Sequence, residues 1–294
     1  MTVGAATALT LFALGLVVVG AIIHALWNLL AKHSEGGTLF VWCYSAVSAA
    51  LYLPLAAWAL SAGGMKWTWL ALGMLAGTGI LHLCYALILQ GGYRRAGLSV
   101  VYPVARGTGP ALSVAGAIFF LGEHATTASV TGALLVVGGV LVIGLARRNG
   151  TGSSVWTGIQ WGGLTGLFIA AYTLNDGAAV RIVGLSPIVV DYFGNVTRTV
   201  LLAPVAWRDP AALRVEWRKN AKYIFGIGAL APIPYILALY AMRLAPISLV
   251  APARELSMLA GVFFGWHFLK EEDIAQRLVG AAFIAAGVVA LSFS

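Results

Sequence analysis

The feature that most constrains this chain is a series of long apolar stretches without a single charged residue. Most of them reach the length of about 20 residues that an α-helix needs to cross the hydrocarbon core of a bilayer. Of the 294 residues, 60% are hydrophobic and only 10% are charged, whereas a soluble domain carries roughly 25% charged residues. The uncharged stretches are 1–31, 36–65, 67–93, 125–146, 149–175, 223–242 and 278–294. The sequence therefore predicts an all-α, polytopic membrane protein.

Two segments that begin directly after two of these stretches look like one segment written twice. Residues 94–103 align with residues 243–252, and the second copy then lacks one residue. Beyond that point the offset is constant, with Arg106, Glu123, Gly132 and Gly139 aligned to Arg254, Glu271, Gly280 and Gly287. Charged residues and glycines that share one spacing inside apolar stretches indicate a duplicated membrane unit.

Ten transmembrane helices fit the chain when breaks are placed at glycines, prolines and charged residues. They span about 5–31, 38–61, 66–91, 97–120, 126–146, 154–181, 187–207, 219–242, 247–269 and 273–292. The first is interpreted as a retained span, because it is too long for a signal peptide and lacks a basic n-region. The segment from Asp209 to Lys222, rich in basic residues, is predicted to separate two of these helices.

The duplication also predicts how the helices are organised. Residues 1–148 form the first five-helix repeat, 149–153 the linker, and 154–294 the second repeat. Because five is an odd number, the second repeat enters the membrane inverted, an arrangement typical of secondary transporters. The predicted fold is therefore ten transmembrane helices in two inverted five-helix repeats around a central cavity.

Several motifs also carry a family resemblance. They are His24-Ala25-Leu26-Trp27-Asn28 with Lys32, the Ser-x-x-x-Pro helix starts at 99–103 and 248–252, and the pair Phe120-Leu121-Gly122-Glu123 and Phe268-Leu269-Lys270-Glu271. With these motifs the chain resembles, over nearly its whole length, the EamA-type ten-helix exporters of the drug/metabolite transporter superfamily, and among them the bacterial aromatic amino-acid exporters. The resemblance implies a cavity lined by the first, third, fourth, sixth, eighth and ninth helices, and export of metabolites.

Polar residues within the spans are candidates for lining that cavity. Inserting an ionisable residue at the centre of a transmembrane helix costs about 2.5–3.5 kcal/mol, so such a residue is expected to face a polar cavity rather than lipid. In the first helix, His24, Trp27 and Asn28 lie at positions i, i+3 and i+4, so they share one face. In the third, His82 and Tyr85 lie at i and i+3. A packed, hydrogen-bonded core residue is the alternative interpretation of each histidine.

The sixth and eighth helices add further candidates. Tyr172 and Asn175 in the sixth roughly mirror the Trp27–Asn28 pair, while the neighbouring Asp176 is expected to be solvated near the helix end. Tyr235 in the eighth lies beside two prolines, whose missing amide hydrogens leave carbonyls that need other partners or a polar cavity.

The fourth and ninth helices carry the charged candidates. Arg106 lies about 14 Å into its helix at 1.5 Å per residue, with Tyr102 one turn above it. Arg254 and Glu255 are the equivalents in the second repeat. An arginine could bind an amino-acid carboxylate and a glutamate its ammonium, with aromatic rings around the side chain. An internal ion pair, such as Arg106 with Glu255, explains the same residues, and both interpretations remain open.

The other charged groups are expected to be structural. Asp191 and Arg198 are predicted to pair outside the cavity, and Glu123 and Glu271 to act as interfacial gates or anchors. Cys43 and Cys84 lie in apolar stretches and are expected to pack as small hydrophobic residues. No catalytic residue, metal site or cofactor is predicted.

These features favour a secondary transporter that exports aromatic and other neutral amino acids, or similar small metabolites, by alternating access. Export of cationic drugs or of other metabolites by the same fold is the alternative. The chain has no Walker A motif, which argues against primary active transport by this chain alone, and proton coupling is left open. An intramembrane enzyme is less favoured, because no nucleophile–base pattern occurs and the Gly-x-Ser sequences at 97–99 and 184–186 lack a following glycine.

The predicted partners are a small-molecule substrate and membrane lipid. The net charge of +8 resides mostly in loops, where anionic headgroups explain it better than nucleic acid does. A multi-pass monomer in the bacterial inner membrane is expected. The resemblance places both termini in the cytoplasm, whereas counting loop arginines and lysines favours the opposite orientation.

Overall fold

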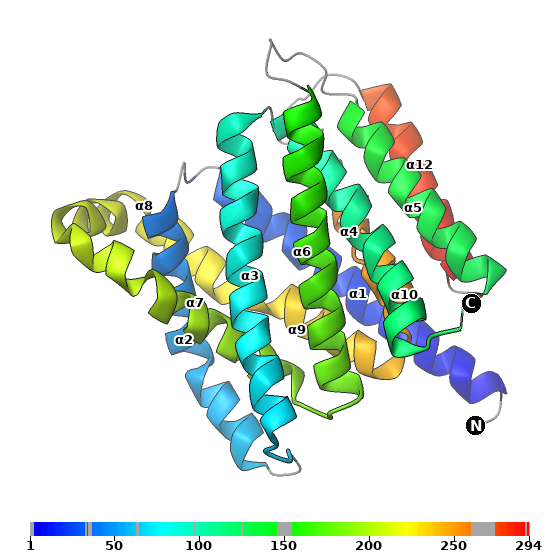
Figure 1. The fold of residues 1–294 in the computed structure, drawn as a ribbon, viewed down its shortest axis with the longest axis horizontal. Coiled ribbons are helices and arrows are strands. Elements are labelled where there is room, and N and C mark those ends of the chain that lie inside the picture. Colours follow the sequence, from blue (N-terminus) through cyan, green and yellow to red (C-terminus); the bar gives the residue numbers. More distant parts are fainter. Residues whose placement is uncertain are drawn as a thin grey trace.

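The computed structural model describes the chain except residues 1–2, 33, 35–36, 63–64, 97, 125, 146–154, 260–273, 292 and 294. The predicted linker, the end of the ninth predicted helix and Glu271 therefore lie outside the described residues. Within the described ranges the chain is helical and has no β-strand (Figure 1). The helices are α1 (Val3–Lys32), α2 (Thr38–Ser61), α3 (Trp69–Arg95), α4 (Leu98–Leu121), α5 (Thr127–Leu145), α6 (Val155–Arg181), α7 (Pro187–Arg208), α8 (Pro210–Leu230), α9 (Pro232–Leu244), α10 (Ile247–Ala253) and α12 (Ile274–Leu291).

The helices suit a bilayer by length and by surface. In the described part of the chain, five helical segments are long and apolar enough to cross a membrane: Thr10–Ala31, Thr38–Ser61, Trp69–Arg95, Val100–Leu121 and Pro210–Leu244. Large apolar side chains point outward, among them Phe119 and Phe120, which are 82% and 83% exposed. Such surfaces are stable against lipid but not against water. The predicted all-α membrane fold is confirmed.

The predicted helix 219–242 is wrong in its extent. The structure has two helices there, α8 and α9, and α8 begins at Pro210, so the basic segment predicted as a break is helical. Asp209 explains the early start, because its side chain accepts a hydrogen bond from Ala212 N at 2.9 Å as an N-cap. Pro210 at the first helical position favours the same start.

The break between α8 and α9 follows from proline chemistry. Pro232 has no amide hydrogen to give to the carbonyl of Gly228, four residues earlier. Ser48 Oγ of α2 donates to that carbonyl instead, at 2.8 Å, and Tyr52 Oη donates to the next one, Ala229 O, at 2.6 Å. The carbonyl freed by the proline and the one after it, both at the break, therefore accept hydrogen bonds from a neighbouring helix, as a membrane interior requires.

The predicted ninth helix is also interrupted. It begins as α10, but Arg254 and Glu255 form a turn before helix resumes at residues 256–259. Backbone hydrogen bonds change there from four-residue to three-residue spacing, with Arg254 N bonded to Val250 O at 3.1 Å and Glu255 N to Pro252 O at 2.9 Å. The backbone is thus irregular at the two charged residues that the sequence analysis singled out.

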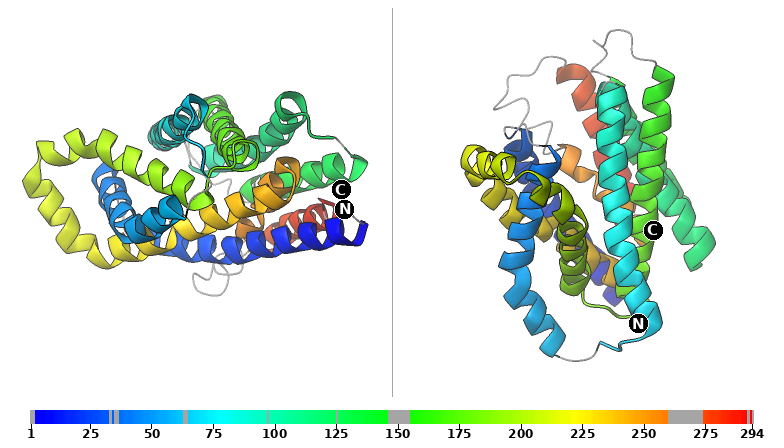
Figure 2. Two further views of the ribbon diagram at one scale, coloured as in Figure 1. Left: turned by 90° about the horizontal axis from the view of Figure 1, so that it is seen from below. Right: turned by 60° about the vertical axis from the view of Figure 1, so that its left-hand side comes forward.

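The helices pack in pairs that are distant in the sequence. α3 and α4 lie against α6, α2 against α7, α1 against α9, and α5 against α12 (Figures 1 and 2). The α5–α12 contact is close because glycines face each other. A Cβ added to Gly132 would lie 2.7 Å from Gly287 O, and one added to Gly139 would lie 2.5 Å from Gly280 O. Small residues of this kind allow backbones to approach within a bilayer.

Candidate substrate cavity

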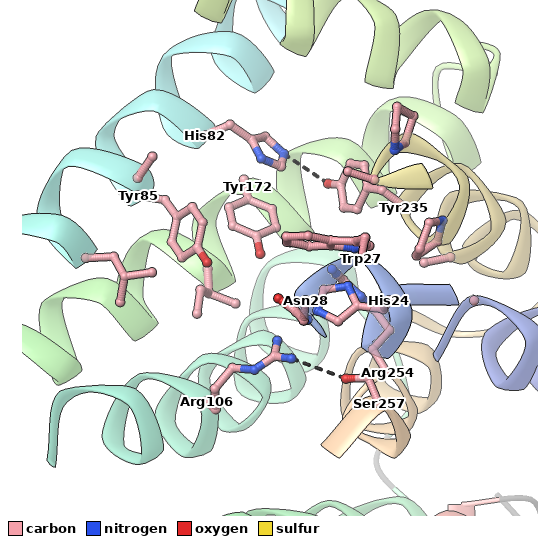
Figure 3. A pocket seen from close by; sticks show the side chains of 18 of the residues that line it. His24, Trp27, Asn28, His82, Tyr85, Arg106, Tyr172, Tyr235, Arg254 and Ser257 are labelled. Atoms are coloured by element: carbon pink, nitrogen blue, oxygen red, sulfur yellow. Dashed lines mark hydrogen bonds between the residues drawn. The ribbon is translucent and has the colours of Figure 1, made fainter. Parts of the chain in front are cut away.

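A cavity of about 330 Å³ lies where α1, α3, α4, α6, α7 and α9 converge with the turn after α10 (Figure 3). Its volume suits one small molecule, since pockets for such ligands start at about 300 Å³. The helices that the family resemblance implied are all represented in its lining. The lining also includes residues of α7 and α2, which the sequence analysis did not expect.

Most of the sequence-predicted candidates lie together on this lining. They are His24, Trp27, Asn28, His82, Tyr85, Tyr102, Arg106, Tyr172, Tyr235 and Arg254. Asn175 and Glu255 do not line the cavity. Asn175 joins α6 to α3, because its Nδ2 donates to Met74 O at 3.0 Å, and Glu255 is buried beside Arg106.

Aromatic rings form one wall of the cavity. The His82 and Tyr172 rings stack with their centroids 4.1 Å apart, and Tyr85 meets Tyr172 edge-on at 5.6 Å. Tyr235 of α9 extends this wall, with its ring centroid 5.1 Å from that of His82. On α1, Trp27 has a buried Nε1 without a hydrogen-bond partner in the described part of the chain. A buried donor left unpaired is uncommon, so Trp27 offers the cavity a hydrogen bond as well as a ring.

The arginines differ in what they contact. Arg106 Nη1 lies 3.3 Å from Glu255 Oε1, and its Nη2 donates to Ser257 Oγ at 3.3 Å. The internal ion pair considered from the sequence is therefore present. Arg254 has its guanidinium 5.2 Å from the Tyr235 ring centroid and no ion pair among the described residues. The two aligned arginines therefore differ. Arg106 forms an ion pair, whereas Arg254 faces the cavity without an ion pair among the described residues.

The expectation that Asp176 is solvated is wrong. Its side chain is fully buried between α3, α6 and α9. Oδ1 accepts from Thr78 Oγ1 and from Asn175 Nδ2, and Oδ2 accepts from Tyr235 Oη. His82 Nε2 lies 3.0 Å from Oδ2. Asp176 lies five residues before the end of α6 at Arg181, but packing against α3 and α9 covers it.

The expectation for α7 was also wrong, since Asp191 and Arg198 line the cavity rather than pairing outside it. Asn195 lies between them on the lining and donates to Asp191 Oδ2 at 3.1 Å. Positions 191, 195 and 198 have the i, i+4, i+7 spacing of one helix face, so this signal was present in the sequence. Tyr44 and Tyr93 also line the cavity, and isolated tyrosines in apolar helices give no comparable signal.

Glu123 holds an end of the bundle together, away from the cavity. Its carboxylate accepts hydrogen bonds from the backbone amides of Ile247 and Ser248, at 2.7 and 2.9 Å. Arg181 of α6 completes the cluster with an ion pair of 2.6 Å. These contacts agree with the anchoring interpretation of Glu123, since the carboxylate ties α4 to α6 and to the start of α10.

Comparison with known proteins agrees with this architecture. Residues 156–293 match the EamA-like transporter family. A crystal structure of another protein has the same fold, with a TM-score of 0.74 over 99% of this chain and 97% of that chain, at 16% sequence identity. No curated protein matches the chain. The second half of the chain therefore matches the EamA-like transporter family, which belongs to the drug/metabolite transporter superfamily, and the whole chain shares its fold with a solved structure.

Proposed function

We propose that the chain is a secondary transporter that exports aromatic and other neutral amino acids, or similar small metabolites, by alternating access. The observation that carries the proposal is Arg254, which has no ion pair among the described residues and lies on the cavity lining beside the aromatic wall, against the ring of Tyr235. A guanidinium binds a carboxylate strongly, and tyrosine and tryptophan rings pack well against an apolar or aromatic side chain. Asp191, on the same lining, supplies a negative charge for an ammonium group.

The charge balance gives less support to the alternative, export of cationic drugs. Among the described residues, the lining contains three arginines (Arg106, Arg198 and Arg254) and a single carboxylate, Asp191. Of the other two carboxylates nearby, Glu255 compensates the charge of Arg106, and Asp176 lies behind His82 and Tyr235 without lining the cavity, so Arg198 and Arg254 still outnumber Asp191 on the lining. A permanent cation would add a like charge to a cavity of low dielectric, which is costly.

Alternating access is commonly carried out by two inverted repeats, here proposed as residues 1–148 and 154–294, and the α5–α12 contact supports such repeats. In the sequence alignment Gly132 corresponds to Gly280, and Gly139 to Gly287. In the structure Gly132 faces Gly287 and Gly139 faces Gly280. If the two repeats are exchanged, the Gly132–Gly287 contact becomes the Gly280–Gly139 contact, and the reverse. This is the property of a self-complementary interface on a twofold axis. α3–α6 and α1–α9 are related in the same way.

We propose a monomer in the bacterial inner membrane that acts without a cofactor and without chemical conversion of its substrate. The aromatic wall and the guanidinium together explain selection by both the charged end and the side chain of an amino acid. In the enzyme alternative the substrate would leave the protein chemically altered. Analysis of the transported compound by mass spectrometry separates the two functions.

A panel of labelled substrates in proteoliposomes tests the proposal. We expect uptake of phenylalanine and tryptophan, slower uptake of threonine and methionine, and none of a permanent lipophilic cation. The control is liposomes without protein. Uptake of the cation with no uptake of any amino acid would support the drug-exporter alternative instead.

A further inference from the structure

The His82–Asp176 pair is a feature that the proposed substrate contacts leave unexplained. Asp176 is fully buried in a membrane-spanning helix and does not line the cavity, whereas His82 and Tyr235, which lie against its Oδ2, do. A buried carboxylate needs hydrogen bonds and a compensating positive charge. Thr78 and Asn175 provide hydrogen bonds but no charge.

The charge partner distinguishes Asp176 from the other buried carboxylate. Glu255 has Arg106 at 3.3 Å, and an arginine remains charged at any physiological pH. In the described part of the chain, Asp176 pairs with no arginine or lysine, and the one group that can supply a positive charge is His82 at 3.0 Å. A histidine is positive only when it holds a proton. Charge neutrality at Asp176 therefore requires one bound proton, on His82 or on the carboxylate itself.

We propose that His82 and Asp176 form a proton-binding site whose occupancy is coupled to substrate, so that the carrier exchanges a proton for an amino acid. The inference rests on the proposed function. His82 and Tyr235 connect the buried carboxylate to the cavity, because His82 Nε2 lies 3.2 Å from Tyr235 Oη and both side chains are on the lining (Figure 3). The proton enters and leaves through this cavity face.

Exchange follows from electrostatics. Arg254 compensates the substrate carboxylate, so the substrate ammonium and a proton on the pair remain as like charges in the same low-dielectric space, and each lowers the affinity for the other. A substrate that enters from one side expels the proton, and a proton that arrives from the other side favours release of the substrate. An exporter also gains energy from an acidic exterior only if protons move inward as substrate moves outward.

Other charged and titratable groups lie on the same cavity lining or directly behind it, as Glu255 does behind Arg106. They are Tyr85 of α3, Tyr172 of α6, Tyr235 of α9, Asp191 and Arg198 of α7, Tyr102 and Arg106 of α4 with Glu255, His24 of α1, and Arg254 after α10. The arginines keep their charge throughout transport. Asp191 is the competing candidate for the proton, because it lines the cavity directly and also lies near a substrate ammonium.

Proton release measures the coupling directly. Phenylalanine is added to the detergent-purified protein in weakly buffered solution with a pH indicator. We expect the wild type to release protons on binding, and 3-phenylpropionate, which lacks the ammonium, to release none. Asp176→Asn and His82→Gln should both lose the release. Thr78→Val is the matched control, since it removes a hydrogen bond to the same carboxylate without removing a titratable group, and it should retain the release.

Transport gives the second measurement. In liposomes with an acidic interior, exchange for one proton supports up to about a tenfold concentration ratio per pH unit. We expect the wild type and Thr78→Val to accumulate phenylalanine under this gradient, and Asp176→Asn to lose the accumulation. Loss in Thr78→Val as well would indicate a purely structural hydrogen-bond network and would overturn the inference.

Two further outcomes separate the inference from the proposed function. If the wild type exchanges phenylalanine but neither releases protons nor responds to the gradient, the inference fails and the proposed function stands. If Asp191→Asn abolishes proton release while Asp176→Asn keeps it, the proton site is assigned to the wrong carboxylate. If the wild type neither binds nor exchanges phenylalanine, the proposed function itself fails.

Discussion

Arg254 and Arg106 show how two residues that are equivalent by sequence acquire different environments. Arg106 lies within the regular helix α4, and its guanidinium is held by Glu255 and Ser257. Arg254 lies in the turn that interrupts the helix after α10, where it contacts the Tyr235 ring from the cavity side. Its side chain faces the cavity, whereas that of the adjacent Glu255 is buried against Arg106. Arg254 is the residue that we propose binds the substrate carboxylate.

At the residue scale, we predict that Arg254→Gln and Glu255→Gln impair transport more than Glu123→Gln does. Arg254→Gln removes a charge-assisted hydrogen bond to the substrate, which contributes about 1.5–3 kcal/mol and hence at least a tenfold increase in KM. Glu255→Gln leaves Arg106 without its ion pair beside the cavity. Initial rates of phenylalanine uptake in proteoliposomes measure all three variants.

Glu123→Gln is the comparison because that carboxylate lies outside the cavity and anchors α10 and α6. We expect it to lower thermal stability while keeping a KM near that of the wild type. Full activity in both Arg254→Gln and Glu255→Gln would argue against the assigned cavity.

At the scale of helices, close packing depends on glycines that face backbone atoms. On α5, Gly139 lies against the carbonyl of Gly280, whereas the adjacent Gly138 has no atom within 4 Å of the position of a Cβ. Backbone cannot move aside as the end of a flexible side chain can. The two neighbouring glycines therefore differ in the cost of one added methyl group.

We predict that Gly139→Ala destabilises the protein and that Gly138→Ala does not. Overpacking of this kind typically costs about 1–3 kcal/mol, whereas alanine is favoured over glycine in an open helical position. Thermal unfolding in detergent, followed by circular dichroism, measures the difference in Tm. Equal Tm values for the two variants would show that α5 and α12 are not in backbone contact.

At the scale of the whole molecule, the bilayer takes the place of water as the solvent for the outer surface. Apolar side chains such as Leu134 on α5 and Phe120 on α4 face outward, while arginines and tyrosines face the central cavity. Lipid accommodates the first set, and the cavity provides polar partners for the second. The protein is therefore polar in its centre and apolar on its outer surface.

We predict that Leu134→Arg prevents normal insertion, whereas Leu134→Ala is tolerated. Leu134 is 66% exposed near the middle of α5, and an arginine at a helix centre costs about 2.5–3.5 kcal/mol on insertion scales. The yield of protein in the membrane fraction, compared between the two variants, tests this. Normal insertion of Leu134→Arg would mean that this face of α5 does not contact lipid.

The sequence alone determined the membrane class, the approximate positions of most helices, and the shared faces of His24 with Trp27 and of His82 with Tyr85. Length, hydropathy and the periodicity of a helix are local properties, so they can be calculated from the chain itself. The duplicated spacing also predicted which residues of the two repeats correspond. Proline positions indicated where carbonyls would need other partners, but not that the helix would break at Ala231.

The tertiary structure decided which way each helix face turns. Periodicity groups Asp191, Asn195 and Arg198 on one face of α7, yet only the packing of α7 against α2 and α3 turns that face toward the cavity. The same holds for Asp176, which is buried because α3 and α9 cover it. Helix rotation is set by contacts between segments far apart in the sequence, and a local pattern contains no information about them.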